Sequence, residues 1–344
     1  MSRYASTSDL ASIAARLRSA AHVTILTHAK PDGDAAGSVL ALARALRALG
    51  KHVDAFFTGA VEANLMSLAL PGEVLLAPAV VPSLTTDLVV VVDTGAWSQV
   101  EPLHDFLRAM AGRVIGLDHH ARGDDIAGDR VVDVSLASAT QLVVKLIDEL
   151  GVPLVAPGAT AKFSIAEAVF TGLATDTGWF RFQNADAAVY ALAARLLALG
   201  VDKIALYQRL EENWRPTRLG MMARALSSLT FHQDGAVALM RISLQDLAET
   251  GASSEDLGGF VNMPLAIGSV TMSIVLTEAE PNLTKASFRS KPSLGEVPTI
   301  DVNAFAARFG GGGHVHAAGA KFKLPFDQAR LEVERELMRL TPVV

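Results

Sequence analysis

Residues 114–120 read Val-Ile-Gly-Leu-Asp-His-His, an apolar run that ends in one carboxylate and two adjacent imidazoles. The apolar part is typical of a buried strand. The polar end consists of side chains that bind divalent metal ions or carry protons. Three other apolar or small-residue segments also end in an acid or a histidine: 23–27 before His28, 88–92 before Asp93, and 168–175 before Asp176. We therefore predict one site assembled from several strand ends.

Near-continuous runs of Val, Ile and Leu alternate with helical stretches in the first half of the chain. We predict strands at residues 23–27, 53–57, 88–92, 113–117 and 131–134, and helices that include 39–49 and 137–150. This alternation indicates a Rossmann-like α/β domain with a parallel sheet covered on both faces. Such sheets bind ligands at the carboxyl ends of their strands, near a change in strand order. The acids and histidines follow strands at that edge.

The second half of the chain divides into a helical stretch and a smaller α/β unit. Residues 185–229 show a helical pattern with interruptions at Gly200 and Pro216. Further strands are predicted at 236–242, 269–276, 284–291 and 320–324, and helices at 244–249, 301–309 and 326–340. We therefore predict a first domain at residues 1–190, a helical linker at 191–229 and a second domain at 230–344.

The composition excludes several classes of protein. At 344 residues the chain is long enough for two domains, and its apolar runs are too short to cross a bilayer. Arg16 and Arg18 interrupt the apolar pattern that a signal peptide needs, so we expect a cytoplasmic protein without a membrane partner. There is no cysteine, which leaves histidine and carboxylates as metal ligands.

The formal net charge of −6 argues against binding of long duplex nucleic acid, which normally requires clustered basic residues. Short anionic substrates remain compatible with this charge. Divalent ions held by acids would reverse the local sign of the charge and attract a phosphate.

The loop at residues 28–38 follows the first predicted strand and holds three metal-ligand side chains within seven residues, His28, Asp32 and Asp34. A loop can fold back so that alternate side chains face neighbouring ions. The alternative is helix capping by Asp34 with solvent exposure of the other two, and helix capping is also the alternative for Asp93 and Asp176. Jointly, six side chains provide the ligands that two Mn²⁺-like ions require: His28, Asp32, Asp34, Asp93, His119 and Asp176.

The motifs exclude two other kinds of site. No nucleophile elbow accompanies Asp93 and His119. The run Gly310–Gly313 leads to His314 rather than to Lys and Ser or Thr, so it is not a P-loop. Four glycines let a backbone approach a ligand closely and offer N–H groups to an anion, with a flexible turn as the alternative.

The predicted strand at 284–291 adds a basic edge near these glycines in sequence. Because side chains alternate along a strand, its two faces differ. One face carries Ser287, Arg289 and Lys291, and the other carries Ala286, Phe288 and Ser290. A ligand with negative charge could bind at the first face.

Together these motifs resemble those of the DHH phosphoesterases. The matching stretches are 27–34, 92–93, 118–120 and 175–178, and Arg289-Ser290-Lys291 followed by 311–314 is similar to the companion DHHA1 domain. The two-domain layout is most similar to the nanoRNase/pAp phosphatase (NrnA-like) group, including actinobacterial members that act on dinucleotides derived from cyclic di-AMP. The resemblance implies a DHH catalytic domain, a DHHA1 substrate-binding domain and a homodimer.

The resemblance also implies a role for each site residue. Asp93 would bridge two Mn²⁺ ions, with Co²⁺ or Mg²⁺ as alternatives. The other ligands would divide between the ions, His28 and Asp32 at one, and Asp34, His119 and Asp176 at the other. Asp118 would support His119, and His120 would face the scissile phosphate. The second domain would hold the substrate through Arg289, Ser290, Gly312, Gly313 and His314.

These roles imply a metal-dependent phosphoesterase. The implied substrates are short 5′-phosphorylated oligoribonucleotides, the dinucleotide pApA and the bisphosphate pAp, with cyclic di-AMP as a further candidate. An inorganic pyrophosphatase or polyphosphatase of the same superfamily is the first alternative. A nucleotide-binding module without turnover is the second, although the complete ligand set speaks against it.

Overall fold

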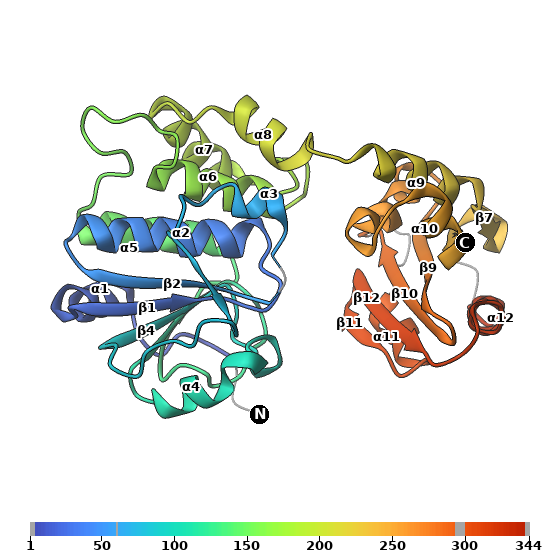
Figure 1. Cartoon of the computed structure of the whole chain (residues 1–344), viewed down its shortest axis with the longest axis horizontal. Helices are drawn as coiled ribbons and strands as arrows, with labels where there is room; N and C mark the ends of the chain where they lie inside the picture. The colour runs from blue at the N-terminus through green and yellow to red at the C-terminus, as the bar shows by residue number, and fades with distance from the viewer. Residues whose placement is uncertain (1–3, 60, 293–299, 341–344) are drawn as a thin grey trace. The chain divides into compact units, whose positions relative to one another are not determined.

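The computed structural model describes residues 4–59, 61–292 and 300–340. The chain separates into two compact units, Met1–Asn213 and Trp214–Val344 (Figure 1). The division falls inside the stretch 191–229 that was predicted as a helical linker. Among the described residues, no helix combines the length and the apolar character that crossing a membrane requires.

The first unit is built on a six-stranded parallel sheet with the order β3-β2-β1-β4-β5-β6. Its strands are β1 (His22–Leu26), β2 (His52–Thr58), β3 (Leu75–Ala77), β4 (Leu88–Val92), β5 (Val114–Asp118) and β6 (Asp129–Val132). The chain proceeds outward from β1 in one direction and from β4 in the other. The strand order therefore reverses between β1 and β4, which is where such sheets bind their ligands.

Helices cover both faces of this sheet. Helices α2 and α5 lie on one face and α4 on the other (Figure 1), and each face has its own apolar core. The helices of this unit are α1 (Leu10–Ser19), α2 (Gly33–Ala48), α3 (Ala63–Met66), α4 (His104–Ala109), α5 (Ala139–Leu150), α6 (Ile165–Asp176), α7 (Ala187–Ala198) and α8 (Lys203–Glu211). The Rossmann-like fold predicted from the alternating pattern is confirmed.

The segment 168–175 differs from its prediction as a strand that ends before Asp176. It is part of helix α6, and Asp176 is the last residue of that helix. Helix α6 is buried along most of its length, from Ile165 to Ala174. A helix that is apolar on all sides lacks the one-sided periodicity that distinguishes a helix from a buried strand.

Glycines allow α2 and α6 to approach each other closely. A Cβ atom on Gly37 would lie 2.4 Å from the carbonyl oxygen of Ala168 and 2.9 Å from the amide nitrogen of Gly172. A Cβ on Gly33 would lie 2.3 Å from the hydroxyl oxygen of Thr175. This approach brings the start of α2 beside the end of α6, the two positions that carry the predicted acids of these helices.

The second unit contains a mixed sheet with the order β11-β12-β10-β9-β8-β7, in which β8 and β9 pair in parallel and the other described pairs are antiparallel. Its strands are β7 (Thr230–His232), β8 (Val237–Ile242), β9 (Met272–Glu280), β10 (Leu283–Ser290), β11 (Gly312–His314) and β12 (Ala317–Phe322). Its helices are α9 (Pro216–Ser227), α10 (Leu244–Thr250), α11 (Val302–Ala307) and α12 (Phe326–Leu337). The predicted second α/β unit is confirmed.

Three-residue strands at sheet edges were not predicted from the sequence. They are β3, β7 and β11, and the last of these contains two of the four consecutive glycines. An edge strand of this length shows too little alternation to be recognised. Five short 3₁₀ helices complete the described structure: Trp97–Gln99, Glu101–Leu103, Gln233–Gly235, Ser254–Leu257 and Phe260–Ala266.

The close approach of α2 and α6 predicts that Gly37→Ala destabilises the protein. The added methyl group would clash with backbone atoms, and overpacking of this kind costs about 1–3 kcal/mol of unfolding free energy. The better helix propensity of alanine offsets only part of this loss. Gly128→Ala is the control, because its Cβ would meet no heavy atom within 4 Å. Equal urea midpoints for the two variants would contradict the packing argument.

Candidate metal centre and active site

Polar side chains from five parts of the first unit converge at the carboxyl edge of its sheet. His28 follows β1, Asp93 follows β4, and Asp118 ends β5. The start of α2 carries Asp34, and Asp176 is the last residue of α6. At this edge lies a pocket of about 140 Å³ that is lined by His28, Asp32, Asp93, Gln99, His119, His120 and Asp176. Six of these seven residues were predicted as site residues; Gln99 was not.

The acids and histidines of this pocket, together with Asp34, form three groups; within each group the possible ligand atoms lie within 4.8 Å of one another. The groups are His28 with Asp32 and Asp93, Asp34 with His119 and Asp176, and Asp93 with His119 and His120. Asp93 belongs to two of the groups and His119 to two. The structure thus brings all six predicted ligands to one place, with Asp93 between the others.

Asp93 has an unusual environment for a carboxylate. It is 3% exposed, and its Oδ1 atom has no hydrogen-bond partner among the described residues. The nearest imidazole nitrogens are Nε2 of His119, 3.4 Å from Oδ1, and Nε2 of His28, 3.6 Å from Oδ2. These separations exceed ordinary hydrogen bonds. A buried oxygen without a partner is costly, and a bound cation would satisfy it.

The backbone turns sharply at Asp93, where φ is 61°. This left-handed conformation is unfavourable for a residue with a side chain and is concentrated at functional sites. It ends β4 and directs the carboxylate to the edge of the sheet beside β1 and β5.

The acids of α2 have different backbone partners. Asp32 caps the helix, because its carboxylate accepts hydrogen bonds from the amides of Asp34 and Ala35 at 3.0 Å each. Asp34 is buried and accepts hydrogen bonds from the amides of Ala139 and Thr140 at the start of α5. Its Oδ2 atom lies 3.8 Å from Nε2 of His119. The helix cap is therefore Asp32 rather than Asp34, and Asp32 also lines the pocket. Asp34 faces His119.

The charges of this site shift the pKa values of its members. Burial raises the pKa of Asp176 to about 7; the charge of His119 opposes this rise, and the charges of Asp93 and Asp32 add to it. Burial and the charges of Asp93 and Asp176 also hold the pKa of Asp34 well above its usual range. Crowded, buried carboxylates need a compensating positive charge. The donor set and the unpartnered Asp93 oxygen therefore fit divalent cations.

The pKa values of the imidazoles also rise, but here the neighbouring carboxylates cause the rise and burial opposes it. Burial lowers the pKa of His28, but the neighbouring carboxylates of Asp93 and Asp32 outweigh it and raise the value to about 9. The pKa of His119 rises to about 10 against the same burial penalty, through Asp93, Asp34 and Asp176. Without metal, protons on these rings balance part of the acidic charge.

Asp118 supports His120 rather than the ring of His119. Nδ1 of His120 lies 2.7 Å from Oδ1 of Asp118, which also accepts the main-chain N–H groups of His119 and His120. The ring of His119 instead has its Nδ1 atom 3.2 Å from the carbonyl oxygen of Leu136. A carbonyl can only accept, so this Nδ1 carries the proton and Nε2 faces the acids. Asp118 was predicted to support His119, and its contact with that residue is through the main-chain N–H, because the chain turns after β5 and lays the His120 ring over Asp118.

The second oxygen of Asp118 is bound by the hydroxyl group of Tyr4. The hydroxyl donates a hydrogen bond of 2.9 Å to Oδ2. Tyr4 was not predicted as a site residue, since an isolated tyrosine near the start of the chain belongs to no motif.

Strand register brings Arg289 and His314 into one row in the second unit. Arg289 on β10 pairs with Ala317 on β12, which pairs with His314 on β11. Burial lowers the pKa of the Arg289 guanidinium. In the part of the chain that the structure describes, no carboxylate forms an ion pair with it. A half-buried cation beside a small residue suits an anionic ligand.

Ser290 and Gly313, two other predicted substrate contacts of this unit, have hydrogen-bond partners within the protein. Ser290 is buried, and its hydroxyl lies 3.1 Å from Nδ1 of His316. The amide of Gly313 donates to the side chain of Asn303 at 2.8 Å, so this N–H is not available to an anion. Alternation along β10 explains the burial of Ser290, because Phe288 on the same face lies in the core.

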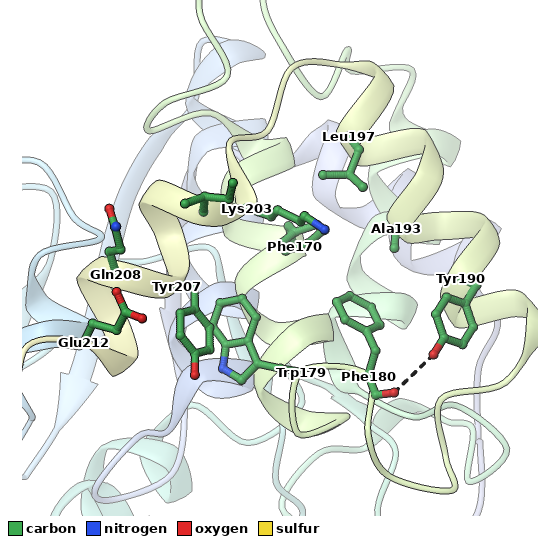
Figure 2. Close-up of a pocket in the computed structure, with 11 residues that line it drawn as sticks. Phe170, Trp179, Phe180, Tyr190, Ala193, Leu197, Lys203, Tyr207, Gln208 and Glu212 are labelled. Carbon is green, nitrogen blue, oxygen red and sulfur yellow. Dashed lines mark hydrogen bonds between the residues drawn. The ribbon is translucent and has the colours of Figure 1, made fainter.

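A second cavity of the first unit is apolar and separate from the acidic pocket. It has a volume of about 480 Å³, and no residue lines both cavities. Figure 2 shows its aromatic walls, with Trp179 beside Tyr207 and the hydroxyl of Tyr190 bonded to the carbonyl of Phe180. Lys203, Gln208 and Glu212 are its polar lining residues. This cavity provides no set of converging metal ligands.

His22, His52 and Asp54 form another cluster whose ligand atoms lie within 4.8 Å of one another. His22 and His52 begin β1 and β2, so the cluster lies at the opposite edge of the sheet from the pocket. Nε2 of His22 is 2.9 Å from Oδ2 of Asp54, so an ion pair or hydrogen bond accounts for the contact.

Two protein-family models match this chain, one in each of its two units. The model of the DHH family, N-terminal domain, matches residues 22–173, and the DHHA1 domain model matches residues 234–338. A bifunctional oligoribonuclease and PAP phosphatase NrnA of Thermus thermophilus is 35% identical, covering 91% of this chain and 89% of that protein. This protein belongs to the DHH family. The resemblance inferred from the four motifs is confirmed.

Two further relatives extend this comparison. The Bacillus subtilis protein with the same description is 25% identical, over 85% of this chain and 87% of its own. The crystal structure of an exopolyphosphatase-related protein from Bacteroides fragilis is similar, with a TM-score of 0.84, 27% identity and coverage of 96% and 95%. The DHH family is metal-dependent, in keeping with the histidine and carboxylate clusters of this DHH protein.

Proton competition predicts that metal affinity falls with decreasing pH. Metal ions must displace protons from the imidazoles, whose pKa values are about 9 and 10, and from Asp176, whose pKa is about 7. Apparent affinity for Mn²⁺ should therefore weaken as the pH falls from about 8 to about 6, and binding should release protons. Calorimetric titration at pH 7 in two buffers of different ionisation enthalpy measures this release. Identical binding heats in the two buffers would rule it out.

Proposed function

We propose that this DHH protein hydrolyses short 5′-phosphorylated oligoribonucleotides and pApA to nucleoside monophosphates and dephosphorylates pAp to AMP. The observation that carries the proposal is the buried, unpartnered Asp93 oxygen between two groups of histidine and carboxylate ligands. The descriptions of the relatives from T. thermophilus and B. subtilis as oligoribonuclease and PAP phosphatase support the substrate class. Cyclic di-AMP is a further candidate substrate.

The metal ions of the proposed site are two Mn²⁺ ions, with Co²⁺ or Mg²⁺ as alternatives. Asp93 would contact both ions. His28 and Asp32 would bind one of them, and Asp34, His119 and Asp176 the other. Such ions supply a nucleophilic water at neutral pH and stabilise negative charge on phosphoryl oxygens.

The side chains around the ligands would orient the reacting phosphate. His120 is 46% exposed at its side chain, lines the pocket, and has its Nδ1 atom fixed by Asp118. Its hydrogen bond with Asp118 raises its pKa, which favours a protonated ring that donates from Nε2 to a phosphate oxygen or to the leaving group. A pocket of about 140 Å³ is small compared with sites that enclose a whole ligand. It would therefore hold the phosphoryl group and leave the nucleosides outside.

The second domain would bind another part of the substrate. Arg289 and His314 would contact a phosphate or a nucleoside, and the Gly312–Gly313 backbone would permit a close approach. The buried position of Ser290 assigns it to support of His316 rather than to direct contact. From the family resemblance we further infer a DHH catalytic domain at 1–190, a linker at 191–229, a DHHA1 domain at 230–344, and a cytoplasmic homodimer as the working form.

A pyrophosphatase or polyphosphatase activity is the second candidate. It would use the same ligand set, and the description of the B. fragilis relative as exopolyphosphatase-related favours it. Steady-state rates in Mn²⁺ on pAp, pApA, pentanucleotide RNA, cyclic di-AMP and pyrophosphate distinguish the candidates. Faster release of phosphate from pyrophosphate than of AMP from pApA would overturn the proposed function, and binding without turnover would establish a silent module.

Asp93→Asn should abolish most turnover while leaving the shape of the side chain intact. Removal of one electrostatic catalytic group costs about 10²–10³ in kcat, and a ligand shared by two ions should cost at least as much. The measurement is kcat on pApA with saturating Mn²⁺. Asp125→Asn is the matched control, since it removes one exposed carboxylate close to the DHH motif in sequence without touching the pocket. Activity retained in Asp93→Asn would refute the mechanism.

His119→Ala and His120→Ala should have different effects. Nε2 of His119 lies between 3.4 and 3.8 Å from oxygens of Asp93, Asp176 and Asp34, so its loss should reduce the number of Mn²⁺ ions bound per chain. His120→Ala should keep the Mn²⁺ content and lower kcat, because its Nδ1 is bound to Asp118. Elemental analysis after gel filtration and steady-state kinetics measure the two effects. Equal metal loss in both variants would contradict the division of roles.

A further inference from the structure

The start of the described chain reaches the proposed site through one side chain, that of Tyr4. Its hydroxyl donates to Oδ2 of Asp118 at 2.9 Å, and Oδ1 of Asp118 lies 2.7 Å from Nδ1 of His120. Tyr4 and Asp118 are 114 positions apart in the sequence. A continuous chain of hydrogen bonds thus connects a residue outside every DHH motif to the imidazole that would face the phosphate.

Two glycines leave space for the ring of Tyr4. A Cβ atom on Gly95 would lie 2.0 Å from the Tyr4 hydroxyl oxygen, and one on Gly123 would lie 2.5 Å from its ring. Neither glycine has a positive φ, so the backbone conformation does not require glycine at these positions. The room for Tyr4 does require it. The guanidinium of Arg130 packs over the same ring, 5.3 Å from the ring centre.

The segment that carries Tyr4 is anchored along strand β6. The amides of Thr7 and Ser8 donate to the carbonyl of Arg130 at 2.9 and 3.1 Å, and the hydroxyl of Ser6 donates to the carbonyl of Val132 at 3.0 Å. These bonds fix the path of the backbone just after Tyr4. The contact between Tyr4 and Asp118 is therefore built into the fold.

The two oxygens of the buried Asp118 have different partners. Oδ1 accepts the amides of His119 and His120 and contacts the His120 ring, whereas the Tyr4 hydroxyl is the hydrogen-bond partner of Oδ2 among the described residues. Burial and the charge of Asp118 raise the pKa of Tyr4 well above its ordinary value, so the phenol stays protonated and donates. Loss of this donor would leave a buried carboxylate oxygen unsatisfied and free the carboxylate to rotate.

We propose that Tyr4 is a positioning residue, which holds the Asp118 carboxylate so that the His120 imidazole presents Nε2 to the substrate phosphate. This inference rests on the proposed function and adds a residue to it. Outer partners of this kind typically change activity by about 10–100-fold when removed. A purely structural residue would affect turnover with or without His120, whereas the effect of Tyr4 on turnover requires the His120 imidazole.

Tyr4→Phe tests the hydroxyl alone, because the ring remains in its glycine slot beside Arg130. We expect kcat on pApA in Mn²⁺ to fall by about tenfold, with KM and Mn²⁺ content unchanged. The melting temperature should fall by only a few degrees, because one buried carboxylate oxygen loses its donor. Tyr190→Phe is the matched control, since it removes a tyrosine hydroxyl that is bonded to Phe180 outside the acidic pocket. In a His120→Ala background, Tyr4→Phe should have no further effect. An unchanged kcat, or an equal loss in both backgrounds, would overturn the inference.

A spectroscopic measurement separates this inference from the proposed function. In ¹⁵N-histidine-labelled protein with Mg²⁺, the proton on Nδ1 of His120 should be shifted downfield by its bond to Asp118. Tyr4→Phe should move this resonance upfield or broaden it by exchange, and Tyr190→Phe should not. If the wild-type protein lacked phosphoesterase activity, the proposed function would fail while this signal still decided the role of Tyr4. An identical resonance in wild type and Tyr4→Phe would refute that role.

Discussion

Crowding of carboxylates at one sheet edge is the constraint on which the rest of this structure depends. Asp34 and Asp93 are almost completely buried, and Asp176 is close enough to add to their repulsion. Like charges at such short range require protons, imidazoles or cations between them. The fold holds the acids in place through groups that do not move easily: the amides at the start of α5 for Asp34 and a left-handed backbone turn for Asp93.

The crowded acids also require close packing of helices α2 and α6. Asp34 lies in the first turn of α2, and Asp176 ends α6. Gly33 and Gly37 let α2 approach α6 closely, and this approach brings the two acids to one site. Gly172 has the same function on α6, since a Cβ there would lie 2.6 Å from Oδ1 of Asp34. The glycines thus serve the site as much as the core.

Sequence patterns could predict the site residues that lie in short motifs or directly after strands. The loop after β1, Asp93 after β4 and the end of β5 were all found in this way, because a parallel sheet gathers the ends of its strands at one edge. The pattern failed at Asp176, since a helix buried on all sides resembles a buried strand. Tyr4 could not be found, because its contact with Asp118 depends on a chain path that no local pattern encodes. Ser290 was assigned to substrate although its face of β10 packs inward.

The adjacent histidines have the same side chain but different hydrogen-bond partners at Nδ1. The Nδ1 atom of His119 faces a neutral carbonyl, which fixes the ring without adding negative charge behind it. The Nδ1 atom of His120 faces the Asp118 carboxylate, which stabilises the imidazolium form. A ring that binds a metal needs a lone pair on Nε2, whereas a ring that stabilises a phosphate needs a proton there. The carbonyl suits the first requirement and the carboxylate the second. The DHH motif would therefore owe its two functions less to the histidines themselves than to the acceptors that the fold places behind them.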